Sequence, residues 1–208
     1  VVPMRYAPGW LASSLATRPW WLMLIAGMVL PTLVLLVYPL LTRKQARPHA
    51  VRLPSLKRVL TELAIAMPIL VVIAGTAWAA QIFILRFAPG EAKSVGDFGR
   101  MAEAADIRYV LGLLLLTFLF APVIEEVFFR GFLFNGLRKR MPLLAALLLS
   151  TIIFALLHRY GPVGTLVVAV HGGVFSLIYL WRKTLLTPIF VHAGYNFLVA
   201  VGMLLAIQ

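Results

Sequence analysis

The chain has 208 residues, of which 62% are hydrophobic and 12% are charged. Soluble globular domains carry about 25% charged residues, so this composition excludes an ordinary soluble domain and indicates a membrane protein. Lys and Arg outnumber Asp and Glu by 19 to 7, and the absence of cysteine excludes disulfides and thiol nucleophiles. The basic residues fall in short clusters between apolar runs, which is typical of topology signals rather than of a nucleic-acid-binding face.

Apolar runs long enough to cross a bilayer recur along the chain. A spanning helix needs about 20 mainly apolar residues. The sequence therefore predicts an all-α, polytopic transmembrane bundle of about six spans, within a single membrane domain covering 1–208. The predicted spans are 20–41, 59–87, 109–134, 141–158, 162–181 and 184–207.

The connections between these runs differ in charge. Loop 42–58 and the turns 138–140 and 182–183 hold most of the basic residues, and all three lie on one side of a six-span topology. By the positive-inside rule that side faces the cytoplasm. We therefore expect a multi-pass protein of a bacterial or archaeal cytoplasmic membrane with both termini outside. The long polar stretch 89–108 is interpreted as a solvated loop, with a surface helix or a lid as the alternative.

Two acidic residues lie side by side in the third predicted span. Glu125 and Glu126 occur within the apolar stretch LLLLTFLFAPVIEEVFFRGFLF. A charge at the centre of a membrane helix costs about 2.5–3.5 kcal/mol, so such carboxylates are candidates for function. Glu126 and Arg130 have the i, i+4 spacing of an ion pair, which assigns them structural support and leaves Glu125 to face the bundle interior. Pro122 predicts a kink beside the pair.

Polar residues in two other spans complete a candidate site. His158 ends the fourth predicted span, while His192 and Asn196 lie at i and i+4 on one face of the sixth. Glu125 and His158 flank the basic turn near Arg140, each about 22–27 Å along its helix at 1.5 Å per residue, and thus at similar depth. We expect these side chains to meet.

The two remaining histidines are assigned no part in this site. His171 precedes Gly172-Gly173, where close helix packing is the commoner explanation, so we interpret it as structural. His49 lies in a basic loop and is excluded.

The candidate residues fit two kinds of hydrolysis. A buried carboxylate and a neutral imidazole can activate water as a general base. A second imidazole and a carboxamide can then stabilise an oxyanion. A Glu with two His also suits a divalent metal such as zinc, with Glu125, His158 and His192 as the ligands. The sequence is compatible with either cofactor state, one divalent metal or none.

Three motifs together resemble a known family. Glu125-Glu126-x-x-x-Arg130, Phe154-x-x-x-His158 and His192-x-x-x-Asn196 match, in order, the motifs of the CAAX prenyl protease and bacteriocin-processing (CPBP, or Abi) intramembrane peptidases. The segment TLLTPIFVHAGYN is also similar to a core helix of that family. The resemblance covers about 109–197, which we take as the predicted catalytic core.

The resemblance implies an activity and a role for each residue. Glu125 would activate water together with His158, while His192 and Asn196 would hold the oxyanion or complete a metal site. Both glutamic-type and metallopeptidase descriptions of the family exist. The implied partners are a membrane-anchored protein or peptide substrate and the lipid bilayer, with no nucleic acid. Eukaryotic members trim the C-termini of prenylated proteins, but this specificity does not extend to many bacterial members.

Other protein classes match the sequence less well. It contains no HExxH motif, Asp97 and Asp106 lie in the polar loop, and Ser150 and Ser176 lack a GxSG setting. These observations disfavour zinc site-2, aspartyl and rhomboid proteases in turn. The main alternative is a non-catalytic membrane protein of the same fold, such as a small transporter or a peptide-immunity protein, because intramembrane Glu and His also form proton relays.

Overall fold

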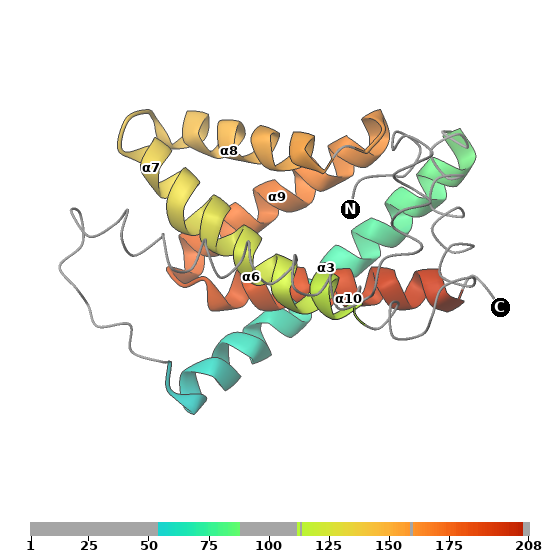
Figure 1. Cartoon of the computed structure of the whole chain (residues 1–208), viewed down its shortest axis with the longest axis horizontal. Helices are drawn as coiled ribbons and strands as arrows, with labels where there is room; N and C mark the ends of the chain where they lie inside the picture. The colour runs from blue at the N-terminus through green and yellow to red at the C-terminus, as the bar shows by residue number, and fades with distance from the viewer. Residues whose placement is uncertain (1–53, 88–111, 113, 159, 206–208) are drawn as a thin grey trace.

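The computed structural model describes residues 54–87, 112, 114–158 and 160–205, and every regular element in this part of the chain is a helix (Figure 1). The bounds are α3 (Leu56–Phe87), η2 (Leu116–Phe120), α6 (Ala121–Glu126), η3 (Val127–Phe134), α7 (Asn135–Arg138), α8 (Leu143–Leu157), α9 (Pro162–Arg182) and α10 (Leu186–Leu205). The all-α class is confirmed, and each predicted span from 59 onward coincides with helical chain. The first predicted span at 20–41, His49 and the polar loop 89–108 lie outside the described residues.

The helices are apolar and largely uncovered by protein. Two of the described helices, Leu56–Ala80 within α3 and Pro162–Arg182, are long and apolar enough to cross a membrane, while Leu143–Leu157 and Leu186–Gly202 are shorter apolar helices. Only 11% of the Leu56–Ala80 window is buried. A core helix of a soluble protein would be mostly buried. The exposed faces of these helices therefore have the character expected of surfaces in contact with lipid.

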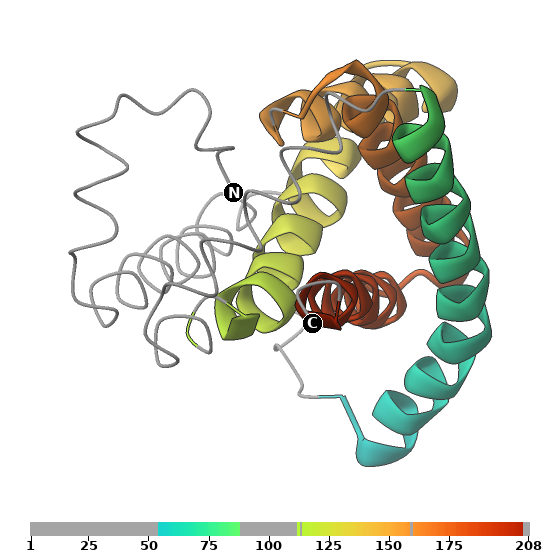
Figure 2. The ribbon, with the colours of Figure 1, turned by 90° about the vertical axis from the view of Figure 1, so that its right-hand side faces the viewer.

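Helix α10 lies at the centre of the described bundle. It contacts α3, α9, η2 and α6, whereas α8 packs mainly against α9. Figure 2 shows α10 nearly end-on, with α3 on one side, the helix that contains α6 on the other, α8 at the top, and α9 running down from the top on the side of α3. This arrangement brings side chains of α6, α8 and α10 within reach of one another.

Local sequence accounts for the helix ends. Ser55 caps α3, because its Oγ accepts a hydrogen bond from the Arg58 N–H at 3.3 Å. Pro162 occupies the first turn of α9, where its missing N–H has no helical partner to lose. At the other end of α9, Lys183 has a φ of 53° and donates its N–H to the Tyr179 carbonyl. This left-handed cap turns the chain into α10.

Residues 114–138 form one continuous helix whose turns widen near the acidic pair. Two π-helical segments, η2 and η3, flank the short α6 that contains Glu125 and Glu126. Pro122 lacks an N–H, and immediately before it the Ala121 N–H bonds to the Leu116 carbonyl, five residues back. The expected disturbance at Pro122 thus takes the form of wide turns, which change the direction of the side chains around the pair.

A small residue brings α8 and α9 together behind the site. A Cβ added at Gly172 would lie 2.7 Å from Cδ1 of Phe154, so only glycine allows this approach. Phe154 is fully buried and is the first residue of the Phe154-x-x-x-His158 motif. The position of His158 therefore depends on the packing of Phe154 against Gly172.

Candidate active site

Glu125 lies between the two histidines singled out from the sequence. Its Oε2 atom is 3.8 Å from Nε2 of His158 and 3.7 Å from Nε2 of His192. These side chains come from α6, from the end of α8 and from α10, so the tertiary fold brings together residues that are up to 67 positions apart. Oε2 is buried and makes no hydrogen bond to the described residues. Separations of this size are too long for direct hydrogen bonds and allow a water molecule to bridge the groups.

Both imidazole rings are oriented through their other nitrogen. His158 Nδ1 lies 2.7 Å from the Phe154 carbonyl oxygen, and His192 Nδ1 lies 2.9 Å from Oε1 of Glu126. A carbonyl or carboxylate oxygen only accepts, so each Nδ1 must carry a proton. Each Nε2 therefore faces Glu125, either as a lone pair or as a second N–H.

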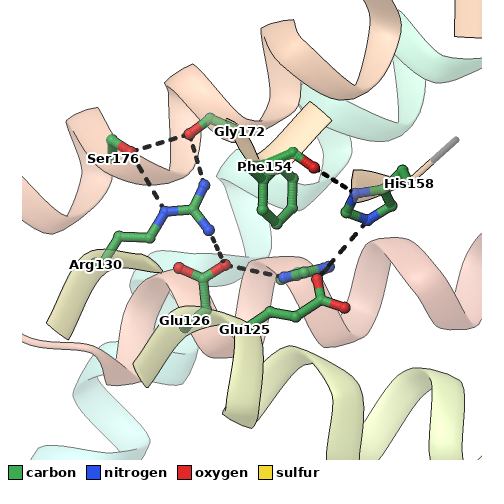
Figure 3. A network of polar contacts seen from close by, with 8 residues as sticks. Glu125, Glu126, Arg130, Phe154, His158, Gly172 and Ser176 are labelled. Atoms are coloured by element: carbon green, nitrogen blue, oxygen red, sulfur yellow. Dashed lines mark hydrogen bonds and ion pairs between the residues drawn. The ribbon is translucent and has the colours of Figure 1, made fainter. Parts of the chain in front are cut away.

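Glu126 belongs to a buried network with Arg130 (Figure 3), and His192 links this network to Glu125. The Oε1 atom of Glu126 accepts hydrogen bonds from both His192 and Arg130, the latter at 2.8 Å. Arg130 also donates to the Gly172 carbonyl at 2.7 Å and to Ser176 Oγ at 3.3 Å. Its guanidinium lies 4.7 Å from the centre of the Phe154 ring, a cation–π distance. The i, i+4 pair expected from the sequence is present, and it reaches His192 as well.

Asn196 makes a helix–helix contact that the sequence did not predict. Its Nδ2 donates to the Thr117 carbonyl oxygen at 2.9 Å, on the helix that contains Glu125. This bond ties α10 to η2 and uses one of the two N–H bonds of the carboxamide. The other N–H is the part of Asn196 that an oxyanion could use.

His171 lies outside the cluster around Glu125. It is buried, its ring centre is 4.6 Å from that of Tyr195, and its Nε2 is 3.5 Å from Thr76 Oγ1. These contacts join α9 to α3 and α10. They are those of a packing residue, as the sequence interpretation expected.

The cluster is open on one side and closed on the other. The side chains of Glu125 and His158 are 30% and 23% exposed, whereas those of His192, Glu126 and Arg130 are 5% exposed or less. Tyr160 follows His158 at the open side, and its ring stacks on the imidazole at 6.1 Å between centres. A substrate can therefore approach Glu125 and His158, with His192 behind them.

The residues around Glu125 offer two imidazole nitrogens and one carboxylate oxygen, which zinc accepts as ligands. Within the described part of the chain, no group of three or more His, Cys, Asp or Glu side chains is arranged to hold a metal ion. The observed separations allow hydrogen-bonded water between the carboxylate and the imidazoles.

A second buried ion pair was missed in the sequence. Glu62 of α3 accepts two hydrogen bonds from Arg182, at 2.9 and 3.1 Å, and a third from Thr187. It joins the start of α3 to the turn between α9 and α10. An acid inside a predicted span was a signal of this pairing, but its partner lies 120 residues away and could not be inferred from local spacing.

Comparisons with known proteins match the part of the chain that contains these residues. The family model described as "Type II CAAX prenyl endopeptidase Rce1-like" matches residues 107–198, which contain all three motifs. A protein of Bacillus subtilis (strain 168) named "Putative membrane peptidase YdiL" is 28% identical over 137 residues, which cover 61% of this chain and 56% of that relative. The chain thus spans a little over half the length of the relative it matches. No solved structure matches the chain. Residues 107–198, which hold all three motifs, are thus similar to the CAAX-type membrane endopeptidases that this family model describes.

Proposed function

We propose that this protein is an intramembrane endopeptidase that hydrolyses a peptide bond of a membrane-anchored protein or peptide. The observation that supports this most directly is the convergence of His158 Nε2 and His192 Nε2 on one buried oxygen of Glu125, at 3.8 and 3.7 Å. We assign residues 1–208 to one multi-pass domain of a bacterial or archaeal cytoplasmic membrane, with its catalytic core at 109–197.

Charge balance favours one protonation state of the cluster. Glu125 and Glu126 contribute two negative charges and Arg130 one positive charge, and unbalanced charge is strongly disfavoured in a buried site. One additional proton makes the cluster neutral. His192 contacts both carboxylates through its two nitrogens, so it is the group that this proton suits best. His158, held by a neutral carbonyl, then remains a neutral imidazole.

In this state the chain's own groups can carry out hydrolysis. A water molecule between Glu125 Oε2 and His158 Nε2 gives a proton to Glu125 as its oxygen bonds to the substrate carbonyl carbon. The carbonyl electrons move to oxygen, and the resulting oxyanion accepts a hydrogen bond from His192 Nε2, assisted by Asn196. When the C–N bond breaks, the proton on Glu125 passes to the leaving nitrogen. The products are a carboxylic acid and an amine, and Glu125 is a carboxylate again.

Glu126 and Arg130 act behind this reaction. Glu126 fixes the His192 ring through Nδ1 and stabilises its positive charge, as a carboxylate does for a catalytic imidazole in hydrolase triads. Arg130 holds Glu126 in turn. Their part in the proposal is therefore electrostatic as well as structural.

Glu125→Gln tests the proposed activity. C-terminal peptides would be compared in cells that express the wild-type chain, Glu125→Gln or Glu62→Gln, the last being a matched change at another buried carboxylate. We expect a set of C-termini to disappear in Glu125→Gln and to persist in Glu62→Gln. Identical C-termini in all three strains would support the non-catalytic alternative instead.

The water-activation step is tested by metal analysis. Purified active protein would be examined for bound metals and assayed with and without a chelator. We expect substoichiometric metal and unchanged activity with the chelator, because Glu125 and His158 act on water directly. One bound metal per chain together with chelator inhibition would replace this step by a metal-assisted one.

A further inference from the structure

The oxyanion in the proposed reaction has few hydrogen-bond donors. His192 offers only Nε2, because its Nδ1 is bound to Glu126. Asn196 has one N–H committed to the Thr117 carbonyl, which holds its carboxamide toward the neighbouring helix. Both residues lie on α10, and His192 is on the closed side of the cluster. Oxyanion sites commonly combine two or more donors, and losing one donor lowers the rate about 10²–10³-fold. A donor from the open side would complete the site.

Tyr160 is placed at that side. It follows the end of α8, and its ring lies nearly parallel to the His158 imidazole, with 29° between the planes and 6.1 Å between the centres. Tyr160 is 47% exposed, so its position is accessible to a substrate. The His158 ring therefore has two aromatic neighbours. The Phe154 ring lies on the side of the bundle, with 4.5 Å between the ring centres, and the Tyr160 ring lies on the outer side.

The backbone at Tyr160 is fixed rather than free. Thr165 Oγ1 donates to the Tyr160 carbonyl oxygen at 3.1 Å, and the Thr165 N–H bonds to the Gly161 carbonyl at 2.8 Å. These two bonds tie the turn to the first part of α9. A side chain on such an anchored turn can be held in place before substrate binds, which electrostatic catalysis requires.

The phenol is also in the right chemical state. The pKa of Tyr160 is raised, first by desolvation of the phenol and further by the negative charge of Glu125. The hydroxyl group thus stays protonated near neutral pH and can donate a hydrogen bond.

We propose that Tyr160 is a further catalytic residue, whose hydroxyl group donates a hydrogen bond to the substrate oxyanion from the open side of the site. This role rests on the proposed peptidase function. The stacked ring would also limit the motion of His158, but the hydroxyl carries the catalytic effect.

The test separates the hydroxyl group from the ring. Tyr160→Phe keeps the stacked ring and removes the donor, and Tyr179→Phe removes a hydroxyl near the far end of α9, where it bonds to Asn135. The rate at which Glu125-dependent C-termini appear would be measured in cells for each variant. We expect about a 10²-fold slower rate for Tyr160→Phe and the wild-type rate for Tyr179→Phe. A peptide built from one of these C-termini should show that kcat falls while KM is unchanged, and the variant's thermal unfolding should match that of the wild type.

Each contrary result has a distinct meaning. A wild-type rate for Tyr160→Phe, with Glu125→Gln inactive, would overturn the role of Tyr160 and leave the peptidase function standing. A raised KM with unchanged kcat would replace oxyanion stabilisation by simple substrate contact, which also overturns the proposal. If no C-terminus depends on Glu125, the peptidase function itself fails, and the role of Tyr160 fails with it.

Discussion

The described part of the bundle contains two glutamate–arginine pairs with buried carboxylates, and the surroundings of the two pairs differ. Glu62 accepts hydrogen bonds at both oxygens from Arg182 and Thr187, so its carboxylate is fully used. Glu126 accepts from Arg130 and His192 at one oxygen only, and its Oε2 is buried without a partner among the described residues. Arg182 is 24% exposed, whereas Arg130 is 1% exposed.

This difference separates a structural ion pair from one that supports chemistry. The Glu62 pair joins α3 to the turn between α9 and α10, and within the described part of the chain Glu62 hydrogen-bonds only to Arg182 and Thr187. The Glu126 pair ends at an imidazole whose other nitrogen faces Glu125. A buried charge influences the reactivity of a neighbouring group that can gain or lose a proton. An ion pair whose carboxylate oxygens all accept hydrogen bonds chiefly fixes the positions of the helices that it joins.

The largest contrast is expected for removal of the carboxylate charge near His192. Glu126→Gln should lower the rate of cleavage on the order of 10³-fold, because the positive charge on His192 loses its partner while the shape of the side chain is kept. The rate for Glu62→Gln should stay close to that of the wild type. Initial rates on a reporter peptide with a membrane anchor would show this, and equal losses in both variants would remove the distinction between the pairs.

Replacing the arginine of each pair by alanine should lower the stability of the fold by different amounts. Arg130→Ala leaves Glu126 buried without its cation, which should destabilise the fold by about 3–5 kcal/mol. Arg182→Ala should cost less, because water can reach the partly exposed site and Thr187 still bonds to Glu62. Denaturant unfolding in detergent micelles would compare the two. A smaller loss for Arg130→Ala than for Arg182→Ala would contradict the assignment.

A third comparison tests the packing behind the Arg130 network. Gly172→Ala places a Cβ 2.7 Å from Phe154, and such overpacking should cost about 1–3 kcal/mol. Activity should fall as well, because the Gly172 carbonyl accepts a bond from Arg130. Gly173→Ala is the matched control, since its Cβ would meet Thr151 at an ordinary 4.0 Å. Thermal unfolding and cleavage assays on both variants would check this, and equal behaviour would argue against a role for this close approach.

The smallest effect on stability is expected for a change of Glu62 in the Glu62–Arg182 pair. Glu62→Gln keeps one acceptor oxygen for Arg182 and Thr187 but loses the charge and the second acceptor, so it should destabilise the fold by about 1 kcal/mol. This change would appear as a lower unfolding midpoint in denaturant, with cleavage unaltered. A large loss of activity here would mean that the position of α3 controls the site.

The features that the sequence predicted depend on neighbouring residues. Apolar runs specify helices because hydrophobic length is a local property, and the predicted spans from 59 onward coincide with the observed helices. The Glu126–Arg130 pair followed from i, i+4 spacing on one helix. The similar depth of Glu125 and His158 followed from their distances to a shared turn. The catalytic roles of these residues stay predictions.

Only the tertiary structure decided which groups meet. His192 lies between Glu125 and Glu126, Asn196 points to Thr117, and Arg182 reaches Glu62 across 120 residues. These contacts depend on the rotation and tilt of each helix, which are set by packing such as that of Phe154 against Gly172. Sequence spacing fixes the relative direction of side chains within one helix but carries no information on the rotation of another helix. The sequence therefore determined the helices and the candidate residues, while packing determined that both histidines face a single carboxylate oxygen.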